Sequence, residues 1–224
     1  DLMYGLPGQT PEQARDDLEQ GIALQPEHLS WYELTLEPNT AFYSQPPALP
    51  GEEPILAIEA EGHALLGNAA YERYEISAYA QAQRRSQHNL NYWEFGDYLA
   101  LGAGAHGKVT LLHSGEVIRY WKTRAPADYL GKASKRNAQQ QVIAATDMPF
   151  EFMMNALRLR DGVDELLFAQ RTGLALASVA KVRRRLVAQG LLEDGPRLRT
   201  STRGGELLNS VLQAFMDEDL ILKR

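Results

Sequence analysis

The sequence predicts an α/β fold, followed by a small helical domain that resembles a winged helix. An apolar run, a helix start and a second apolar run follow one another within the first 36 residues, which is the order of a parallel crossover unit. From about residue 126 the pattern changes to helical segments followed by two short strand-like runs, which is typical of a winged helix. We therefore expect two domains, residues 1–125 and 126–224, and a chain that is 44% hydrophobic can build a core in each.

The first 36 residues carry clear start and stop signals. Residues 1–5 predict a short buried strand that ends at a turn rich in glycine and proline. Thr10 is a favourable N-cap and Pro11 a favourable first helical residue, and the helix should end before Pro26. Residues 28–36 are rich in aromatic and aliphatic side chains, so they predict the second strand.

The remaining elements are predicted from periodicity and from turn residues. Residues 37–50 should form a loop, because prolines at four positions prevent regular structure throughout. The other expected elements are a helix at 52–68, strands at 72–79 and 91–95, a hairpin over 111–118, helices at 150–160, 164–172 and 176–189, a wing over 190–200 and a closing helix from residue 202.

Composition excludes several classes of protein. The chain has no cysteine, which rules out disulfides, thiolate zinc sites and cysteine-ligated iron–sulfur clusters within these residues. The net charge of -6 argues against a polyanion-binding protein. Neither a run of roughly 20 apolar residues nor a signal peptide is found, so we expect a cytoplasmic protein. Because a strand begins right after Asp1, we also expect the chain to be the downstream part of a longer polypeptide.

The densest group of chemically active side chains is the hexapeptide His88-Asn89-Leu90-Asn91-Tyr92-Trp93. An axial haem ligand needs an accessible imidazole, which His88 supplies, and aromatic neighbours that stack on a macrocycle, which Tyr92 and Trp93 supply. The alternative is that His88 is structural and bonds a neighbouring carbonyl. The residues alone leave both interpretations open.

Two glycine-rich segments have a structural and a binding interpretation. Gly5–Thr10 lacks the Gly-Lys-Ser/Thr ending of a phosphate loop, so a strand-to-helix turn is the simpler explanation. Gly102–Gly107 contains His106 as its only reactive side chain and lacks the spacing of a dinucleotide motif. Its small residues would let a cofactor approach the backbone closely, or would simply form a turn.

The basic run Lys181–Arg185 lies on the third helix of the expected winged-helix segment. In a DNA-binding protein this helix carries the recognition side chains. However, Val179, Val182 and Leu186 give an ordinary apolar face, which places the arginines on the solvated side. Nucleic-acid binding is therefore the third alternative, and nucleic acid is not an expected partner.

Taken together, the motifs resemble a known family. The segments Asp1–Thr10, His28–Leu34, Tyr74–Ser77, His88–Trp93 and Leu101–His106 resemble, in this order, the oxygen-independent coproporphyrinogen III oxidase-like radical-SAM proteins. The segments Arg171–Gly173 and Gly190–Leu192 look like the C-terminal domain of that family. The resemblance implies the later part of a partial (β/α) radical-SAM barrel, followed by the winged-helix-like domain.

Within the family, the hexapeptide resembles that of the haem chaperone branch. This implies a protein that binds haem and passes it to apo-proteins such as respiratory cytochromes. The alternative is the oxidase, which converts coproporphyrinogen III to protoporphyrinogen IX by radical decarboxylation, so the resemblance leaves enzyme activity open. The resemblance to the chaperone branch implies an apo-haem-protein as the acceptor, and weak membrane association through that acceptor. It leaves the oligomeric state open.

The resemblance also implies cofactors and their contacts. The family holds a [4Fe-4S] cluster with a Cys-x-x-x-Cys-x-x-Cys motif, which this chain lacks, so the cluster ligands are expected upstream of Asp1. The predicted S-adenosylmethionine contacts are Asp1, Glu33, Gly102, Gly104 and His106. The predicted haem site consists of His88 as the iron ligand with Asn89, Tyr92 and Trp93 around it.

Overall fold

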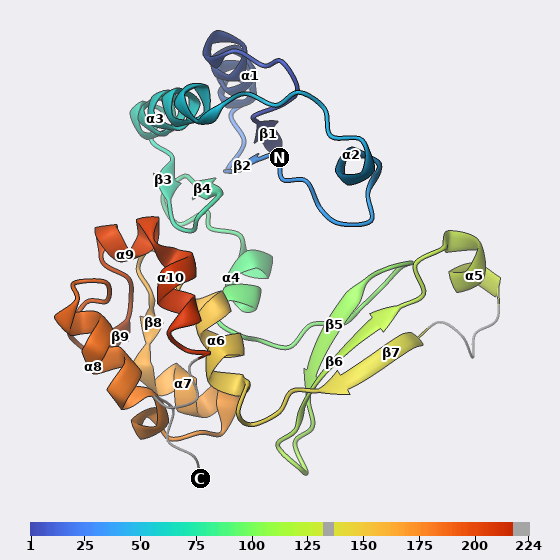
Figure 1. Ribbon diagram of the computed structural model, residues 1–224, viewed down its shortest axis with the longest axis vertical. Helices are drawn as coiled ribbons and strands as arrows, with labels where there is room; N and C mark the ends of the chain where they lie inside the picture. Colours follow the sequence, from blue (N-terminus) through green and yellow to red (C-terminus); the bar gives the residue numbers. More distant parts are fainter. Residues whose placement is uncertain (132–136, 217–224) are drawn as a thin grey trace. The chain divides into compact units, whose positions relative to one another are not determined.

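The computed structural model describes residues 1–131 and 137–216 (Figure 1). The chain divides into two compact units, Asp1–Ser86 and Gln87–Arg224. The domain boundary predicted between residues 125 and 126 falls within the second unit, and it stays a prediction. In the described residues, the structure has no helix that is long and apolar enough to cross a membrane.

The first unit combines a four-stranded sheet with helices. Its elements are β1 (Leu2–Tyr4), α1 (Pro11–Ala23), β2 (His28–Glu33), α2 (Ala41–Ser44), α3 (Glu52–Asn68), β3 (Glu72–Arg73) and β4 (Ala78–Ala80). The strand order is β1-β2-β4-β3. β1 and β2 are parallel, which confirms the predicted crossover unit, whereas β4 is antiparallel to both of its neighbours.

Two predictions for this unit need correction. The single strand expected over 72–79 is a hairpin, because Arg73 and Tyr79 pair with each other across a turn. The loop expected over 37–50 contains the one-turn helix α2, which begins where the Thr40 hydroxyl accepts a hydrogen bond from the amide of Tyr43. Both errors come from short elements that a periodicity window does not resolve.

The start of α1 follows the local signals in the sequence. Thr10 and Gln13 form a capping box, and Pro11 occupies the first turn. α1 then buries Ala14 and Leu18 in the core of this unit. The same core contains Leu29, Trp31, Ile58, Leu66, Tyr4, Tyr71 and Tyr79.

α3 approaches the sheet at a glycine. A Cβ atom on Gly62 would lie 2.0 Å from the Trp31 ring, so only glycine fits at this point of the helix. The buried Trp31 ring lies against α3 at Gly62. Its centroid is 4.4 Å from that of the Tyr4 ring.

The second unit contains a three-stranded antiparallel sheet and a helical cluster (Figure 1). Its elements are α4 (Gln87–Trp93), β5 (His106–Thr110), β6 (Val117–Lys122), α5 (Pro126–Gly131), β7 (Asn137–Val142), α6 (Met148–Ala156), β8 (Val163–Asp164), α7 (Glu165–Thr172), the 3-10 helix η2 (Leu176–Val179), α8 (Ala180–Ala188), β9 (Arg197–Leu198), α9 (Thr202–Glu206) and α10 (Leu208–Gln213). β5, β6 and β7 are adjacent in this order.

Two elements of the second unit differ from the prediction. Residues 91–95, expected as a strand, contain the second half of the helix α4 and the turn that ends it. Residues 137–142, expected among short helices, form the strand β7, all of whose residues are exposed. The run Asn-Ala-Gln-Gln-Gln-Val has little β propensity, and its pairing with β6 determines its conformation.

The C-terminal part of this unit matches the predicted winged-helix pattern. Three helical segments pack around the buried Phe152, Phe168 and Leu186. The wing is closed by the antiparallel pairing of β8 with β9 and by a bridge between Leu192 and Thr200. The predicted α/β fold with a winged-helix-like domain is therefore confirmed, while the barrel stays a prediction.

Candidate functional site

The most exposed chemical group of the hexapeptide is the imidazole of His88, in the first turn of α4. Its ring lies edge-on to the ring of Tyr92, with centroids 4.7 Å apart and an interplanar angle of 78°. The contact follows from the helix, because residues four apart lie on the same face. The helix therefore brings together two of the residues that the sequence singled out.

Tyr92 is fixed from its other side by Tyr98. The two rings are in contact, with centroids 4.2 Å apart and planes tilted by 48°. Burial raises the pKa of the Tyr98 phenol above its ordinary value, against the opposing effect of Arg119. The Tyr98 amide and carbonyl both pair with the backbone of Lys108 on β5. An aromatic row from His88 through Tyr92 to Tyr98 thus joins α4 to the sheet.

Trp93 lies at the end of α4, where its ring contacts a cation. The Arg158 guanidinium, just past the end of α6, lies 4.5 Å from the centroid of the indole ring. The indole nitrogen Nε1 is buried, and it has no hydrogen-bond partner among the described residues. Trp93 therefore links the end of α4 to a residue that follows α6, and its indole N–H group does not face solvent. Asn89, the remaining predicted residue, is partly buried in the first turn of the helix.

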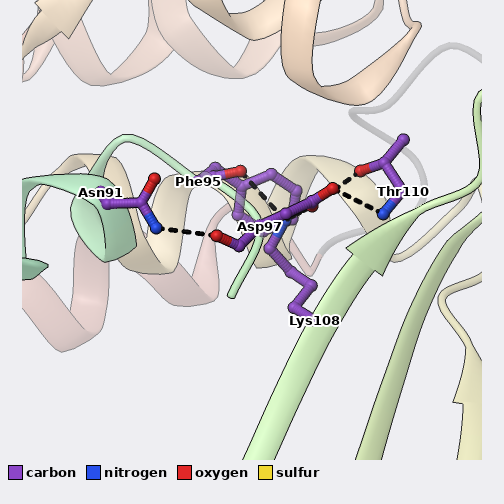
Figure 2. Close-up of polar contacts among 5 residues, drawn as sticks. All are labelled: Asn91, Phe95, Asp97, Lys108 and Thr110. Atoms are coloured by element: carbon purple, nitrogen blue, oxygen red, sulfur yellow. Dashed lines mark hydrogen bonds and ion pairs between the residues drawn. The ribbon is translucent and has the colours of Figure 1, made fainter. Parts of the chain in front are cut away.

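A polar network follows α4 and joins it to β5 (Figure 2). The Asn91 amide donates to the carbonyl of Asp97 at 2.9 Å. The Asp97 carboxylate accepts hydrogen bonds from the amide and the hydroxyl of Thr110 and from the Lys108 ammonium. Burial acts to raise the pKa of this carboxyl, but these hydrogen bonds outweigh it and hold the pKa below the ordinary value. Sequence reasoning missed this network.

The predicted S-adenosylmethionine contacts fall in both units. In the first unit, Asp1 precedes β1, whereas Glu33 is the last residue of β2 and pairs in register with Tyr4. Because the two strands are parallel, the two exposed carboxylates lie at opposite ends of the strand pair. Beside Glu33, the Tyr4 hydroxyl donates to Glu59 at 2.6 Å. Burial and this hydrogen bond raise the pKa of Tyr4 above its ordinary value.

The other three predicted contacts lie in the second unit, in and after the turn before β5. Gly102 and Gly104 have φ values of +100° and +70°, which favour glycine. A Cβ atom on Gly102 would meet nothing within 4 Å, and on Gly104 it would come no nearer than 3.9 Å to Arg124. The exposed His106 ring stacks on Trp121 with centroids 6.0 Å apart. Both glycines therefore adopt the backbone conformation that the turn requires, and the space on their Cβ side is open.

The basic helix α8 uses one of its arginines within the fold. Arg183 forms an ion pair with Glu165 at 2.8 Å and donates to the carbonyl of Gly195. Val182 and Leu186 are buried, as the apolar periodicity predicted, and Arg184 and Arg185 are exposed. A groove of about 490 Å³ runs beside this helix, between η2 and the wing.

Known proteins resemble the chain along nearly its whole length. Residues 143–207 match the family model of the HemN C-terminal domain. The chain is 44% identical over 220 residues to the heme chaperone HemW of Haemophilus influenzae, a match that covers 98% of this chain and 57% of the relative. It is 45% identical over 219 residues to the heme chaperone HemW of Escherichia coli K12, which covers 97% and 57%.

A solved structure has a similar fold. The coproporphyrinogen III oxidase HemN of Escherichia coli, described as a radical SAM enzyme, superimposes with a TM-score of 0.70 at 19% identity, over 97% of this chain and 54% of that one. The chain spans 57% of the length of the two curated relatives named above. The motifs, the C-terminal domain and the relatives agree: along nearly its whole length the chain is similar to heme chaperones named HemW, and residues 143–207 match the HemN C-terminal domain.

Proposed function

We propose that the whole protein is a haem chaperone, which binds haem and delivers it to apo-haem-proteins. The observation that carries this proposal is the exposed imidazole of His88, held edge-on by Tyr92 at 4.7 Å. The names of the two curated relatives from Haemophilus influenzae and Escherichia coli support the same function. In this proposal haem is the cargo, and His88 is its axial ligand.

The chemistry of the residues around α4 fits this cargo. An axial ligand needs an imidazole nitrogen that the iron can reach, and His88 is exposed where a structural histidine would be covered. Tyr92 and Trp93 supply aromatic surface beside it, and Asn89 supplies an amide. We therefore assign these three residues to the haem site as well.

S-adenosylmethionine and a four-iron cluster are the resident cofactors that the family implies. Asp1 and Glu33 in the first unit, and Gly102, Gly104 and His106 in the second, stay the predicted contacts of S-adenosylmethionine, and the turn at Gly102 and Gly104 is open on its Cβ side. The cluster does not fit this chain, because it has no cysteine. We therefore derive no radical step from these residues.

The acceptor would be an apo-haem-protein, met in the cytoplasm or at the membrane surface. A chaperone must release its cargo, so a single exposed histidine suits it better than a closed pocket with two ligands. Arg183 is engaged with Glu165, so this arginine is not free to contact a phosphate, which argues against nucleic acid as the ligand.

A haem titration of the full-length protein, followed at the Soret band, tests the proposal. The wild-type protein should show a saturable shift, and His88→Ala should abolish it or raise the Kd by roughly tenfold or more. His113→Ala is the matched control, because His113 is also exposed in the second unit but lies in the turn between β5 and β6. Its titration should equal that of the wild type.

Two results would contradict the proposal. Equal titrations for His88→Ala and the wild type would make His88 structural. Turnover of coproporphyrinogen III by the full-length protein, measured as formation of the decarboxylated product, would favour the oxidase instead.

A further inference from the structure

The end of α4 has an unusual conformation. The amide of Gly96 donates to the carbonyl of Asn91 at 2.7 Å, and the amide of Phe95 donates to the carbonyl of Tyr92 at 3.0 Å. This is the Schellman pattern of a helix C-terminus, in which the left-handed residue is usually glycine. Here it is Phe95, with φ of 57°. A bulky residue in this region is strained, and the surrounding structure must hold it.

Glycine occupies the next position for a separate reason. A Cβ atom on Gly96 would lie 2.1 Å from the side-chain oxygen of Asn91 and 2.8 Å from its carbonyl. The Asn91 side chain fills that space because it donates to Asp97. Position 96 therefore accepts only glycine, and the left-handed conformation falls on Phe95.

One side chain holds Phe95 in place from two directions (Figure 2). The Lys108 ammonium donates to the carbonyl of Phe95 at 3.0 Å and lies 4.1 Å from the centroid of the Phe95 ring. The Asp97 carboxylate, 3.2 Å away, is its third neighbour. The Lys108 side chain is only 3% exposed and that of Phe95 is buried, so the contacts between these two residues are shielded from water, whereas the Asp97 side chain is 44% exposed.

A buried ammonium in this place needs an explanation. Burial lowers the pKa of Lys108, and the positive charges of Arg171 and Arg119 act in the same direction, while Asp97 opposes them. An apolar side chain of the same length would avoid the cost of desolvation. A hydrocarbon cannot donate a hydrogen bond to the Phe95 carbonyl, so the lysine provides what this turn requires.

We propose that Lys108 is a positioning residue, which fixes the left-handed turn after α4 and so holds His88 and Tyr92 in one orientation for the ligand. The ligand part of this inference rests on the proposed haem site. Two contacts link Lys108 to Tyr92. The Tyr92 carbonyl accepts a hydrogen bond from the Phe95 amide, and the Tyr92 ring contacts that of Tyr98, whose backbone pairs with Lys108.

The test compares Lys108→Met with Lys122→Met in the full-length protein. Methionine keeps the length of the side chain and removes the charge and the donors. Lys122 is the matched control, because it lies on the neighbouring strand β6, contacts the Tyr120 ring and donates to Asn137, away from α4. Amide hydrogen exchange over residues 87–97, the urea midpoint and the haem titration are measured for each protein.

For Lys108→Met we expect the amides of Glu94, Phe95 and Gly96 to exchange roughly tenfold faster or more. The Kd for haem should rise by a similar factor, with a changed Soret position, while Lys122→Met matches the wild type in both. If Lys108→Met fails to fold, Asp97→Asn serves as a milder variant. It keeps an acceptor and removes the carboxylate beside Lys108, so it should show the same changes at roughly a third of the size.

The outcomes separate this inference from the proposed function. If amide hydrogen exchange over residues 87–97 were unchanged in Lys108→Met, Lys108 would not stabilise the end of α4. Faster exchange with an unaltered haem titration would overturn its positioning role and leave it a stabilising residue. A wild-type protein that binds no haem contradicts the proposed function, whereas the exchange results still decide whether Lys108 fixes the turn.

Discussion

The rings of Tyr92 and Tyr98 are in contact, with centroids 4.2 Å apart and planes tilted by 48°, although Tyr92 lies in the helix α4 and Tyr98 pairs with the strand β5. Tyr92 also contacts His88, so the orientation of the exposed imidazole depends on a ring that is anchored to β5. The orientation of His88, the candidate haem ligand, therefore depends in part on Tyr98, which lies beyond the turn that ends α4.

Replacing Tyr92 tests this support. Tyr92→Ala removes the ring contacts with His88, Trp93 and Tyr98, and we expect it to lower the free energy of unfolding by about 1–3 kcal/mol. It should also weaken haem binding, because His88 loses the ring against which it packs. Tyr92→Phe keeps these ring contacts, so its urea midpoint and Soret titration should remain near those of the wild type. Equal losses in the two variants would mean that the hydroxyl, and not the ring, is the important group.

The close approach of α3 to the sheet gives a prediction about stability alone. In Gly62→Ala the new methyl would lie 2.0 Å from the Trp31 ring, so we expect a loss of about 1–3 kcal/mol in the free energy of unfolding. Gly67→Ala is the control on the same helix, since a Cβ atom there meets nothing within 4 Å. It should unfold at an equal or higher urea concentration. A neutral Gly62→Ala would show that Trp31 moves aside without cost.

The lowered pKa of Asp97 predicts a loss of stability in acid. A carboxyl with a depressed folded pKa stabilises the fold fully above its ordinary pKa of 3.8, and that contribution is lost as the pH falls through the folded value. Asp97→Asn should therefore unfold more easily than the wild type at pH 7, and the difference should shrink in acid. Urea midpoints measured at several pH values check this. Asp128→Asn, on the exposed helix α5, should show no such convergence.

Local signals predicted the elements whose stabilising contacts are local. The capping box at Thr10 and the apolar stripe through Val182 and Leu186 both appear in the structure as expected. The strand predicted at 91–95 is wrong, because the end of α4 depends on Lys108, a partner on a distant strand. Likewise β7 forms on the edge of β6 without a local strand pattern.

The candidate site was predictable only in part. An imidazole with aromatic neighbours in one hexapeptide indicated His88, Tyr92 and Trp93, and the helix, which the sequence did not predict, places the rings of His88 and Tyr92 in contact. Lys108 was missed because a single lysine in a strand looks the same whether it faces water or the core. Tyr98 was missed because its role depends on stacking across a turn, which no spacing rule describes.

The left-handed Phe95 restricts the substitutions that can accumulate here. While Phe95 remains, losing Lys108 leaves a strained turn with an unsatisfied buried carbonyl, at a cost of about 1–3 kcal/mol. Glycine at position 95 would relieve the strain in the turn, but the carbonyl there would still need a donor, and the core would lose the Phe95 ring, whose centroid lies 5.7 Å from that of Phe152. Relatives with glycine at position 95 should therefore still carry a lysine or another donor at position 108, and loss of that donor should destabilise the turn with either residue at position 95.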